Sequence, residues 1–371
     1  MPTLRWRAFR LPMRHRFEAA HGAMSDRRGV LLELRDDEGH VGVGEASPIA
    51  SLGYGTVEDV LALLRQHGGA LPAMLPTITP AALDARAPGV MALRCALDVA
   101  ALDLEGRRTG RTVASLLSTT VASTVRVNAI IGEGTPEETA RYGIEAVAQG
   151  YSVLKAKVGS APLVEDVRRI AVLRDACPDA TIRLDANGAW DEATAIAAVR
   201  ALTPLRIELI EQPVAAGDVE ALARVRAAAS GALLIAADEA ATNPDALARV
   251  LALHAADLVV LKPMFLGGLR PAFEVARRAA TAGLGAFATT TFDSSIGTAA
   301  ALHLAAAIGG LGDNNVAHGL GTGEHLAVDF VRHTLLARGG MLALPDGAGL
   351  GVAPDDEAWQ RVAESDWVVA S

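Results

Sequence analysis

The sequence predicts an α/β protein whose larger part is a (β/α)8-type barrel, with a smaller α+β domain in front of it. From about residue 125, short apolar runs alternate with amphipathic segments of helical length that are rich in Ala, Arg and Glu. Eight such runs follow one another. Their spacing is about 27 residues, which is enough for one strand, one helix and two loops. Eight units of this size close into a barrel, although a doubly wound sheet is the main alternative.

Residues 1–124 are expected to form the α+β domain. The stretch "GVLLELRDDEGHVGVGEASP" contains an apolar run, a D-D-E-G turn and a second alternating run, which is the pattern of a β-hairpin. The stretch "LRCALDVAALDLEGRRTG" has apolar residues at helical spacing and ends at glycine, which predicts a helix. Strands followed by helices, without alternation, are typical of an α+β domain.

The barrel is expected over residues 125–324, and the segment 325–371 leaves its rhythm. Within that segment, "GGMLALPDGAGLGV" is typical of a turn-rich hairpin. We expect this carboxyl-terminal segment to return to the α+β domain.

The composition indicates a protein that acts on small molecules. A net charge of −9 and a pI near 5.5 argue against nucleic acid as the main partner. The two cysteines, Cys95 and Cys177, are too few for a disulfide framework and predict reduced thiols. Neither a signal peptide nor an apolar run of about 18 residues is apparent. We therefore expect a cytoplasmic protein without a membrane span, and a homo-oligomer is compatible with the sequence.

Three successive runs end at carboxylates, namely Asp185, Glu211 and Asp238. The carboxyl ends of barrel strands meet on one face, so these acids are expected to converge. Each could instead cap the helix that follows it. Three grouped anions would be costly in a dry barrel mouth, and a divalent cation removes that cost. Hard oxygen ligands suit Mg²⁺, with Mn²⁺ as a substitute, so the sequence predicts a metal site.

Lysines flank these acids along the chain. Lys155 and Lys157 close the preceding run, and Lys262 closes the run after Asp238. Residues i and i+2 of a strand share a face, so each lysine ammonium favours loss of a proton from the other. A free lysine has a pKa of about 10.4 and must lose its proton before it acts as a base. The pair therefore predicts a base beside a metal, an arrangement that removes a proton next to a carboxylate and stabilises the enediolate.

Other motifs carry less information. "GVGEASP" and "GLGTGE" are glycine-rich, but neither has the spacing of a nucleotide-binding loop. Ser294 and Ser295 lack the surroundings of a serine nucleophile. His303 and His318 show no metal-ligand spacing, and we expect both to be structural.

The motifs at the strand ends resemble those of the enolase superfamily, and within it those of the muconate-lactonizing (muconate cycloisomerase) subgroup. They are "KAK" at 155–157, "LDANGAW" at 184–190, "EQP" at 211–213, "ADEA" at 237–240 and "LKP" at 261–263. The resemblance covers nearly the whole chain. It implies a modified (β/α)7β TIM barrel, an α+β capping domain that closes over the substrate, Mg²⁺ and a small carboxylate substrate.

Within this subgroup, "TTTFDSSIG" and "GLGT" are most similar to motifs of o-succinylbenzoate synthases, as is Arg183. Dipeptide epimerases typically carry an Asp-x-Asp near the eighth strand, and none is present here. The resemblance implies syn-dehydration of 2-succinyl-6-hydroxy-2,4-cyclohexadiene-1-carboxylate in menaquinone biosynthesis. Lys157 would be the base, Lys155 would lower its pKa, and Lys262 would supply positive charge. The implied substrate contacts are Arg183, Asn187, Thr289, Thr290, Asp293 and Gly319.

Other functions are compatible with the same lysines and acids. A dipeptide epimerase or N-succinylamino acid racemase would exchange protons through both Lys157 and Lys262, one on each face of the carbon. A muconate cycloisomerase would use the same lysines and metal. A barrel that binds a metal without catalysis is a third class, but it needs no lysine base, so the Lys-x-Lys pair argues against it.

Overall fold

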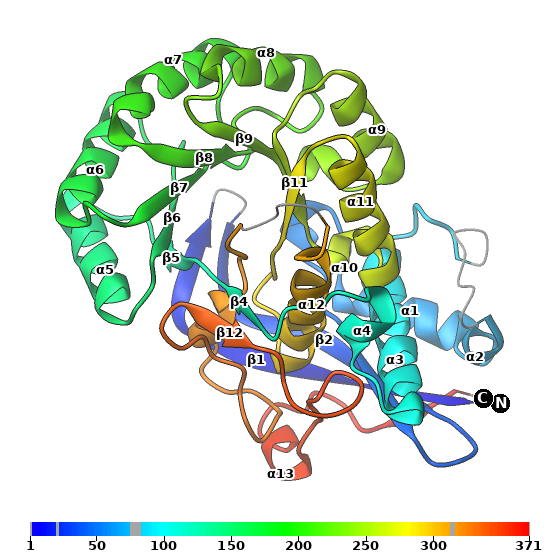
Figure 1. Ribbon diagram of the computed structural model, residues 1–371. Coiled ribbons are helices and arrows are strands. Elements are labelled where there is room, and N and C mark those ends of the chain that lie inside the picture. The colour runs from blue at the N-terminus through cyan, green and yellow to red at the C-terminus, as the bar shows by residue number, and fades with distance from the viewer. Residues whose placement is uncertain (1, 20–21, 75–82, 312–315, 371) are drawn as a thin grey trace.

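A computed structural model describes residues 2–19, 22–74, 83–311 and 316–370. These residues form an antiparallel sheet with covering helices and a curved parallel sheet ringed by helices (Figure 1). The parallel sheet has the strand order β11-β10-β9-β8-β7-β6-β5, and the antiparallel sheet has the order β13-β1-β2-β3. The predicted α/β barrel with an α+β domain is confirmed in the architecture.

The antiparallel sheet is made by β1 (Thr3–Ala19), β2 (Gly22–Arg35) and β3 (Val41–Ala46). Its helices are α1 (Val57–His67), α2 (Leu71–Met74), α3 (Val90–Thr109) and α4 (Val113–Leu117), and the 3₁₀-helix η1 (Ala50–Leu52) follows β3. Helix α3 lies directly against β3 because two glycines of that strand leave room for the helix backbone. A Cβ on Gly44 would come within 1.9 Å of the Ala96 carbonyl oxygen. We refer to this unit as the capping domain.

The parallel strands follow the predicted runs and alternate with helices that cover the outside of the ring (Figure 1). The strands are β5 (Ala129–Ile131), β6 (Val153–Lys157), β7 (Thr181–Asp185), β8 (Ile207–Glu211), β9 (Leu234–Ala237), β10 (Leu258–Leu261) and β11 (Gly285–Ala288). The helices are α5 (Pro136–Ala148), α6 (Leu163–Ala176), α7 (Glu192–Leu202), α8 (Val219–Ala229), α9 (Pro244–Ala252), α10 (Pro263–Leu266), α11 (Leu269–Thr281) and α12 (Ser295–Ile308). Short 3₁₀-helices are η2 (Thr203–Leu205), η3 (Glu239–Ala241) and η4 (Gly321–His325).

The eighth predicted run closes the ring without forming a full strand. His318 makes a parallel bridge to Val127, and Gly319 makes one to Thr289 on the opposite side. The His318 N–H donates to the Arg126 carbonyl at 2.8 Å. This short segment therefore joins the two edges of the seven-stranded sheet.

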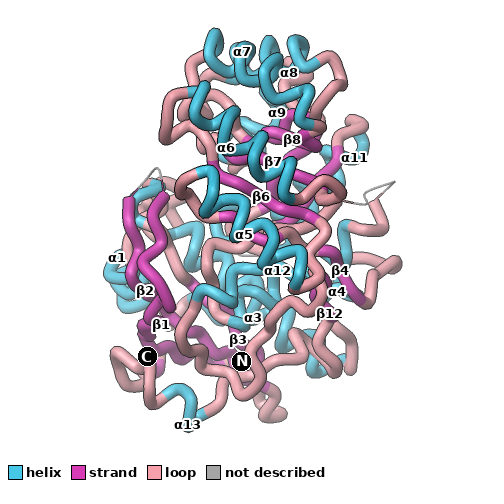
Figure 2. The backbone as a smooth tube through the Cα atoms, turned by 90° about the vertical axis from the view of Figure 1, so that its left-hand side faces the viewer, coloured by secondary structure: helices cyan, strands magenta, loops and turns pink. Residues whose placement is uncertain are grey.

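The carboxyl-terminal segment contacts both units. Strand β13 (Val368–Val369) pairs with β1, and helix α13 (Asp356–Trp359) brings Trp359 within 6.1 Å of Phe9 between ring centroids. Strand β12 (Met341–Ala343) pairs with β4 (Thr124–Arg126) at the start of the barrel. The predicted hairpin is confined to a tight turn in which Met341 pairs antiparallel with Arg338, and β12 then pairs with β4 and not with the residues that follow it. Figure 2 shows α13 and the capping sheet at the end of the molecule away from α7 and α8.

Two histidines are buried as structural groups, as the sequence predicts. His303 on α12 accepts the Ala114 N–H through Nδ1 at 3.2 Å, and its Nε2 lies 3.1 Å from the Leu350 carbonyl. Burial lowers the pKa of His303 to about 4, so the ring is neutral. His318 accepts the Ala288 N–H at 3.0 Å. Across the described part of the chain, no helix is long and apolar enough to cross a membrane.

Candidate active site

A cavity opens where the carboxyl ends of the barrel strands face the capping domain. The capping domain contributes mostly apolar side chains, namely Met24, Ile49, Ser51 and Leu52. The barrel contributes charged, amide and hydroxyl groups together with Ile130, Phe292 and Gly319; its polar lining residues are Asn128, Lys155, Lys157, Asp185, Asn187, Glu211, Glu239, Lys262, Thr289, Thr290, Thr291 and Thr322. One wall is thus apolar and the other is polar and charged, as in many small-molecule sites.

Strand register brings the predicted base beside the predicted metal ligands. Lys157 is paired with Asp185 across β6 and β7, and Asp185 is paired with Glu211 across β7 and β8. Because these three residues end their strands at the same level, their side chains meet at the barrel mouth. Asp238 follows β9 directly, and Lys262 follows β10.

The lysines bond to the acids directly. The Nζ of Lys157 donates to Asp185 Oδ2 and to Asn187 Oδ1, both at 2.6 Å. The Nζ of Lys155 lies 2.7 Å from Glu211 Oε2 and 2.9 Å from Asp185 Oδ2. Lys155 and Lys157 therefore share one carboxylate, which accounts for two like charges on one strand face.

Lys262 makes the matching contact on the other side, with Asp238. Its ammonium also lies 5.6 Å from the ring centroid of Phe265. We call the whole group the barrel-mouth cluster, and its members are Lys155, Lys157, Asp185, Glu211, Asp238 and Lys262.

The pKa shifts differ among the three acids of this cluster. Burial acts to raise the pKa of Asp185, but Lys155 and Lys157 outweigh it and hold that pKa well below its usual range, whereas the other two acids shift upward. Burial raises the pKa of Glu211 to about 7, and the neighbouring Asp185 adds to the rise. Burial, then Glu239, raises the pKa of Asp238. Burial acts to lower the pKa of Lys155, but Asp185 and Glu211 outweigh it and hold that pKa above its ordinary value. A further cation at this place would relieve the carboxylates.

The residues present fit a divalent metal ion. Asp185, Glu211 and Asp238 are each 1% exposed and offer hard oxygen ligands. Glu239 also lines the cavity, and its Oε2 is buried without a hydrogen-bond partner. In this structure the lysine ammoniums lie between the three acids, which therefore do not form a tight group by themselves. Mg²⁺ or Mn²⁺ held here would replace part of that lysine pairing.

A tighter acidic group lies elsewhere among the described residues and belongs to a turn. Asp36, Glu38 and His40 follow β2, and their ligand atoms lie within 4.8 Å of one another. Asp36 accepts the Glu38 and His40 main-chain N–H groups at 3.0 and 2.8 Å, so its carboxylate already stabilises the turn. The group is also partly exposed, and none of its three members lines the cavity.

Four of the predicted substrate contacts line the cavity, namely Asn187, Thr289, Thr290 and Gly319. Thr290 Oγ1 lies 2.6 Å from the hydroxyl of Thr322. The hydroxyl of Thr289 is buried without a partner. A buried hydroxyl facing a cavity is available to a bound molecule.

Arg183 and Asp293 do not line the cavity. Arg183 lies two residues before Asp185 on the same strand face, so it points into the barrel one layer deeper. There its guanidinium pairs with Glu208 and donates to the Ala317 carbonyl at 2.6 Å. Asp293 lies between β11 and α12, facing Arg27 of the capping domain. Their predicted direct substrate contacts are therefore corrected to roles inside the protein.

Several cavity residues are absent from the predicted set. Asn128 lies within the first barrel run, directly before β5, where it is the polar residue of an otherwise apolar stretch and could have been identified as such. Glu239 adjoins the predicted ligand Asp238 in "ADEA". The capping-domain residues have no comparable signal, because Met24 on β2 and Ile49, Ser51 and Leu52 at η1 follow no pattern that distinguishes them from ordinary packing or surface residues.

Known families and proteins resemble this chain over its length. A family model described as "Enolase C-terminal domain-like" matches residues 138–358, and one for the mandelate racemase / muconate lactonizing enzyme N-terminal domain matches residues 5–118. An N-succinyl-L-Arg/Lys racemase of Bacillus cereus is 30% identical, covering 80% of this chain and 82% of its own. A chloromuconate cycloisomerase of Cupriavidus pinatubonensis is also 30% identical, with 96% of each chain covered.

Solved structures share the fold. A dipeptide epimerase of Enterococcus faecalis, complexed with Mg and the dipeptide L-Leu-L-Tyr, superposes with a TM-score of 0.87 at 28% identity. The match covers 95% of this chain and 100% of that one. The magnesium of that structure belongs to a relative whose barrel has the same architecture.

Proposed function

Because this chain belongs to the mandelate racemase and muconate lactonizing enzyme family of the enolase superfamily, we propose that it removes a proton from the carbon next to a substrate carboxylate. The similar proteins described above are a racemase, an epimerase and a cycloisomerase. Those three reactions differ in their products but can share an intermediate with enolate character. Removal of the proton next to the carboxylate is the chemistry that the proposal takes from these relatives.

Lys157 is the base that we assign to this step. It lines the cavity, and Asp185 and Asn187 fix its ammonium from two sides at 2.6 Å. Once this ammonium has lost a proton, the amine held by the same partners meets the substrate carbon in one orientation, which lowers the entropic cost of proton transfer. Lys155 binds the same carboxylate and keeps positive charge next to Lys157.

Asp185, Glu211 and Asp238 would hold Mg²⁺. When bound, the ion supplies positive charge next to the substrate carboxylate, where negative charge grows as the proton leaves. The rise in the pKa of Glu211 to about 7 supports this assignment, because burial and Asp185 leave its charge incompletely compensated.

After the proton has been removed, the outcome that the geometry supports best is return of a proton from the opposite face, which inverts the configuration of the carbon. The observation that carries this conclusion is the placement of two lysines on both sides of the acids. Lys157 ends β6 and Lys262 follows β10, with β7, β8 and β9 between them in the sheet. Both side chains line the same cavity. One lysine can take the proton while the other delivers one.

The substrate class that we favour is an N-succinylamino acid or a related N-acylamino acid. A dipeptide carries a free ammonium group, and a site for it needs an acid at the far end of the cavity. The lining residues from the β11 and 317–322 segments are hydroxyl-bearing, apolar or glycine and include no acid. An acylated nitrogen is neutral and needs none.

Dehydration to o-succinylbenzoate is the second candidate. Lys262 is paired with Asp238 and lies near the face of Phe265, which suits a fixed cation rather than a base. A dehydration needs a single base, Lys157, that later protonates the leaving hydroxide. The similarity of "TTTFDSSIG" and "GLGT" to such synthases supports this candidate, whereas the relatives named above support the first.

The deciding experiment follows substrate α-protons by NMR in D₂O with purified protein and Mg²⁺. The panel contains N-succinyl-L-amino acids, L-dipeptides, cis,cis-muconate and the hydroxycyclohexadiene carboxylate. We expect deuterium incorporation with inversion among the N-succinyl compounds. An aromatic product from the cyclohexadiene, with no inversion elsewhere, would establish the second candidate. If no compound in the panel reacts, the proposed substrates are wrong.

A lysine variant separates the two roles of Lys262. In a racemase, Lys262→Ala stops inversion but still lets Lys157 exchange the proton of one enantiomer. In a synthase, the same variant slows aromatisation without changing which face is attacked. The matched variant Lys157→Ala should stop both reactions.

A further inference from the structure

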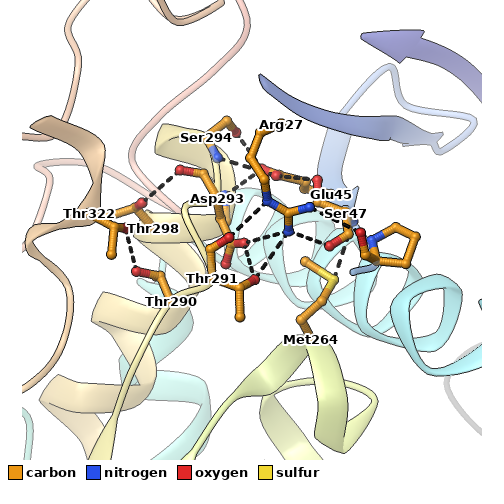
Figure 3. Close-up of polar contacts among 12 residues, drawn as sticks. Arg27, Glu45, Ser47, Met264, Thr290, Thr291, Asp293, Ser294, Thr298 and Thr322 are labelled. Carbon is orange, nitrogen blue, oxygen red and sulfur yellow. Dashed lines mark hydrogen bonds and ion pairs between the residues drawn. The ribbon is translucent and has the colours of Figure 1, made fainter. Parts of the chain in front are cut away.

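A second group of buried charges joins the capping domain to the barrel. Arg27 comes from β2, Glu45 from β3, and Asp293 from the segment between β11 and α12. They are 3%, 2% and 5% exposed. We call these three residues the interdomain cluster, and Figure 3 shows Arg27 between the side chains of the two units.

The guanidinium of Arg27 binds main-chain carbonyls on both sides of the domain boundary. Its Nη1 donates to Pro48 O at 3.0 Å and its Nη2 to Ser47 O at 2.5 Å, both in the capping domain. Its Nε donates to Thr291 O at 2.8 Å in the barrel, and Nη2 also reaches the Thr291 hydroxyl at 3.2 Å. Every nitrogen of the group is therefore engaged, and Asp293 Oδ1 lies 3.5 Å from Nη2.

Glu45 makes a second connection between the same two segments. Its carboxylate accepts the Ser47 hydroxyl at 2.6 Å within the capping domain. It also accepts the main-chain N–H groups of Ser294 and Gly297 at 3.2 and 3.0 Å, at the start of α12. Figure 3 shows Glu45 and Ser47 together on one side of Arg27, with Asp293 and Thr291 on the other.

The two connected segments each form part of the cavity wall, one from the capping domain and one from the barrel. Ser47 and Pro48 lead into Ile49, Ser51 and Leu52, which form the capping-domain wall. Thr291 lies among the hydroxyl-bearing lining residues that follow β11. Arg27 itself is not among the lining residues, so it touches both walls from behind.

The backbone of the barrel wall needs external support. Phe292, which lines the cavity, has φ of 61°, a left-handed conformation that is costly for a bulky residue. The residues on both sides of it are held, Thr291 by Arg27 and by the Asp293 carboxylate at 2.7 Å. Such a conformation persists only where neighbouring contacts determine it.

We propose that Arg27 is a positioning residue that sets the distance between the two cavity walls, and so determines which substrates fit, without touching the substrate. Lysine cannot replace it, because one ammonium cannot reach carbonyls in both walls with the planar fork of a guanidinium. Buried ion pairs of this kind are costly compared with apolar packing, which points to a requirement for a defined geometry at this boundary. The second part of the proposal, on substrate fit, rests on the proposed function, whereas the wall geometry does not.

Arg174 offers a matched control. It is also a buried arginine whose guanidinium donates to main-chain carbonyls, including Leu205 O at 2.9 Å and Ala180 O at 2.6 Å. These carbonyls precede β7 and β8, at the end of the barrel away from the cavity. Arg174→Lys thus removes similar bonds without touching either wall.

The first test is hydrogen–deuterium exchange of the full chain, which needs no substrate. We expect Arg27→Lys to speed amide exchange at least about threefold in both wall segments, 49–56 and 290–297, because local opening becomes easier. Arg174→Lys should leave both segments unchanged. Equal exchange in Arg27→Lys and the unsubstituted protein, or an equal rise in both variants, would overturn the proposal.

The second test uses whichever substrate the unsubstituted protein converts. We expect Arg27→Lys to raise KM about tenfold, the effect of losing charge-assisted hydrogen bonds, with a much smaller change in kcat. In Arg27→Ala, added guanidinium ion should lower KM again, whereas added ammonium should not. A fall in kcat with unchanged KM would contradict the assigned role. If no substrate is converted, the proposed function fails and the exchange experiment alone decides the role of Arg27.

Discussion

The barrel-mouth cluster and the interdomain cluster are both buried and both charged, but they have different kinds of partner. At the barrel mouth, each lysine bonds to side chains, such as Lys157 to Asp185 and Asn187. In the interdomain cluster, Arg27 bonds largely to main-chain carbonyls, and Glu45 accepts two main-chain N–H groups besides two hydroxyls. A side-chain partner can be exchanged for an ion or a substrate by rotation about a few bonds, whereas a main-chain partner moves only with the fold.

This difference separates chemistry from architecture. The acids at the barrel mouth adjoin a cavity and are paired with lysine side chains that can move, so the cluster is suited to binding a cation and transferring a proton. The interdomain cluster is fully bonded within the protein and holds two segments in register.

The largest effect is expected from Lys157→Ala, which removes the proposed base. The rate of α-proton exchange should fall by about 10⁴-fold, the upper range for a general base. The melting temperature should change little, because the partners that Lys157 leaves behind, Asp185 and Asn187, are side chains, and Lys155 still pairs with Asp185. NMR exchange rates and thermal unfolding measure the two quantities. A large loss of stability with residual activity would mean that Lys157 is architectural.

Arg27→Met, in contrast to Lys157→Ala, should strongly reduce the stability of the folded protein. It leaves Glu45 and Asp293 buried without their cation, and breaking a buried pair in this way costs about 3–5 kcal/mol of unfolding free energy. Denaturant unfolding monitored by circular dichroism measures this loss. The double variant Arg27→Met with Asp293→Asn should recover part of it, since the unpaired charge is reduced. A loss below about 1 kcal/mol would show that main-chain bonding at this boundary is dispensable.

Magnesium should distinguish the clusters directly. At 100 times its dissociation constant, the ion should raise the unfolding free energy by about 2.7 kcal/mol. Glu211→Gln should lose this response, whereas Glu45→Gln should keep it, because Glu45 lies outside the barrel-mouth cluster. Thermal unfolding with and without Mg²⁺, after treatment with a chelator, provides the measurement. An unaltered response in Glu211→Gln would remove that residue from the metal site.

The smallest expected effect is a pH dependence carried by Glu45. Burial, reinforced by Asp293, raises the pKa of Glu45 from 4.5 to about 7. Between these values the folded protein holds a proton that the unfolded chain has released. Stability from this group is therefore complete below pH 4.5 and is lost as the pH rises through 7.

Glu45→Gln checks this sign, because the amide cannot titrate. Its unfolding free energy should lack the downward slope between pH 4.5 and 7 that the unsubstituted protein shows. Parallel denaturation curves at several pH values compare the two proteins. Identical slopes would assign the titration to another group.

Much of the barrel and its site follows from the sequence. The regular spacing of apolar runs predicts the barrel, and the confirmed superfamily agrees with the strand-end motifs. Because residues two positions apart on a strand share a face, the sequence would also have placed Arg183 on the same face as Asp185 and one layer deeper in the barrel. The o-succinylbenzoate synthase assignment is finer than these patterns support, because the proton-abstraction chemistry is common to several family members.

The sequence alone determined which acids and lysines converge, because in a parallel barrel the position of a residue at a strand end sets its place at the mouth. Only the tertiary structure decided that Lys155 and Lys157 share Asp185, and that Arg27 and Asp293 meet across the domain boundary. Arg27 and Asp293 are separated by 266 positions, and such contacts leave no periodic signal along the chain. They arise from how the capping domain and the barrel pack against each other, which depends on the shapes of both surfaces at once.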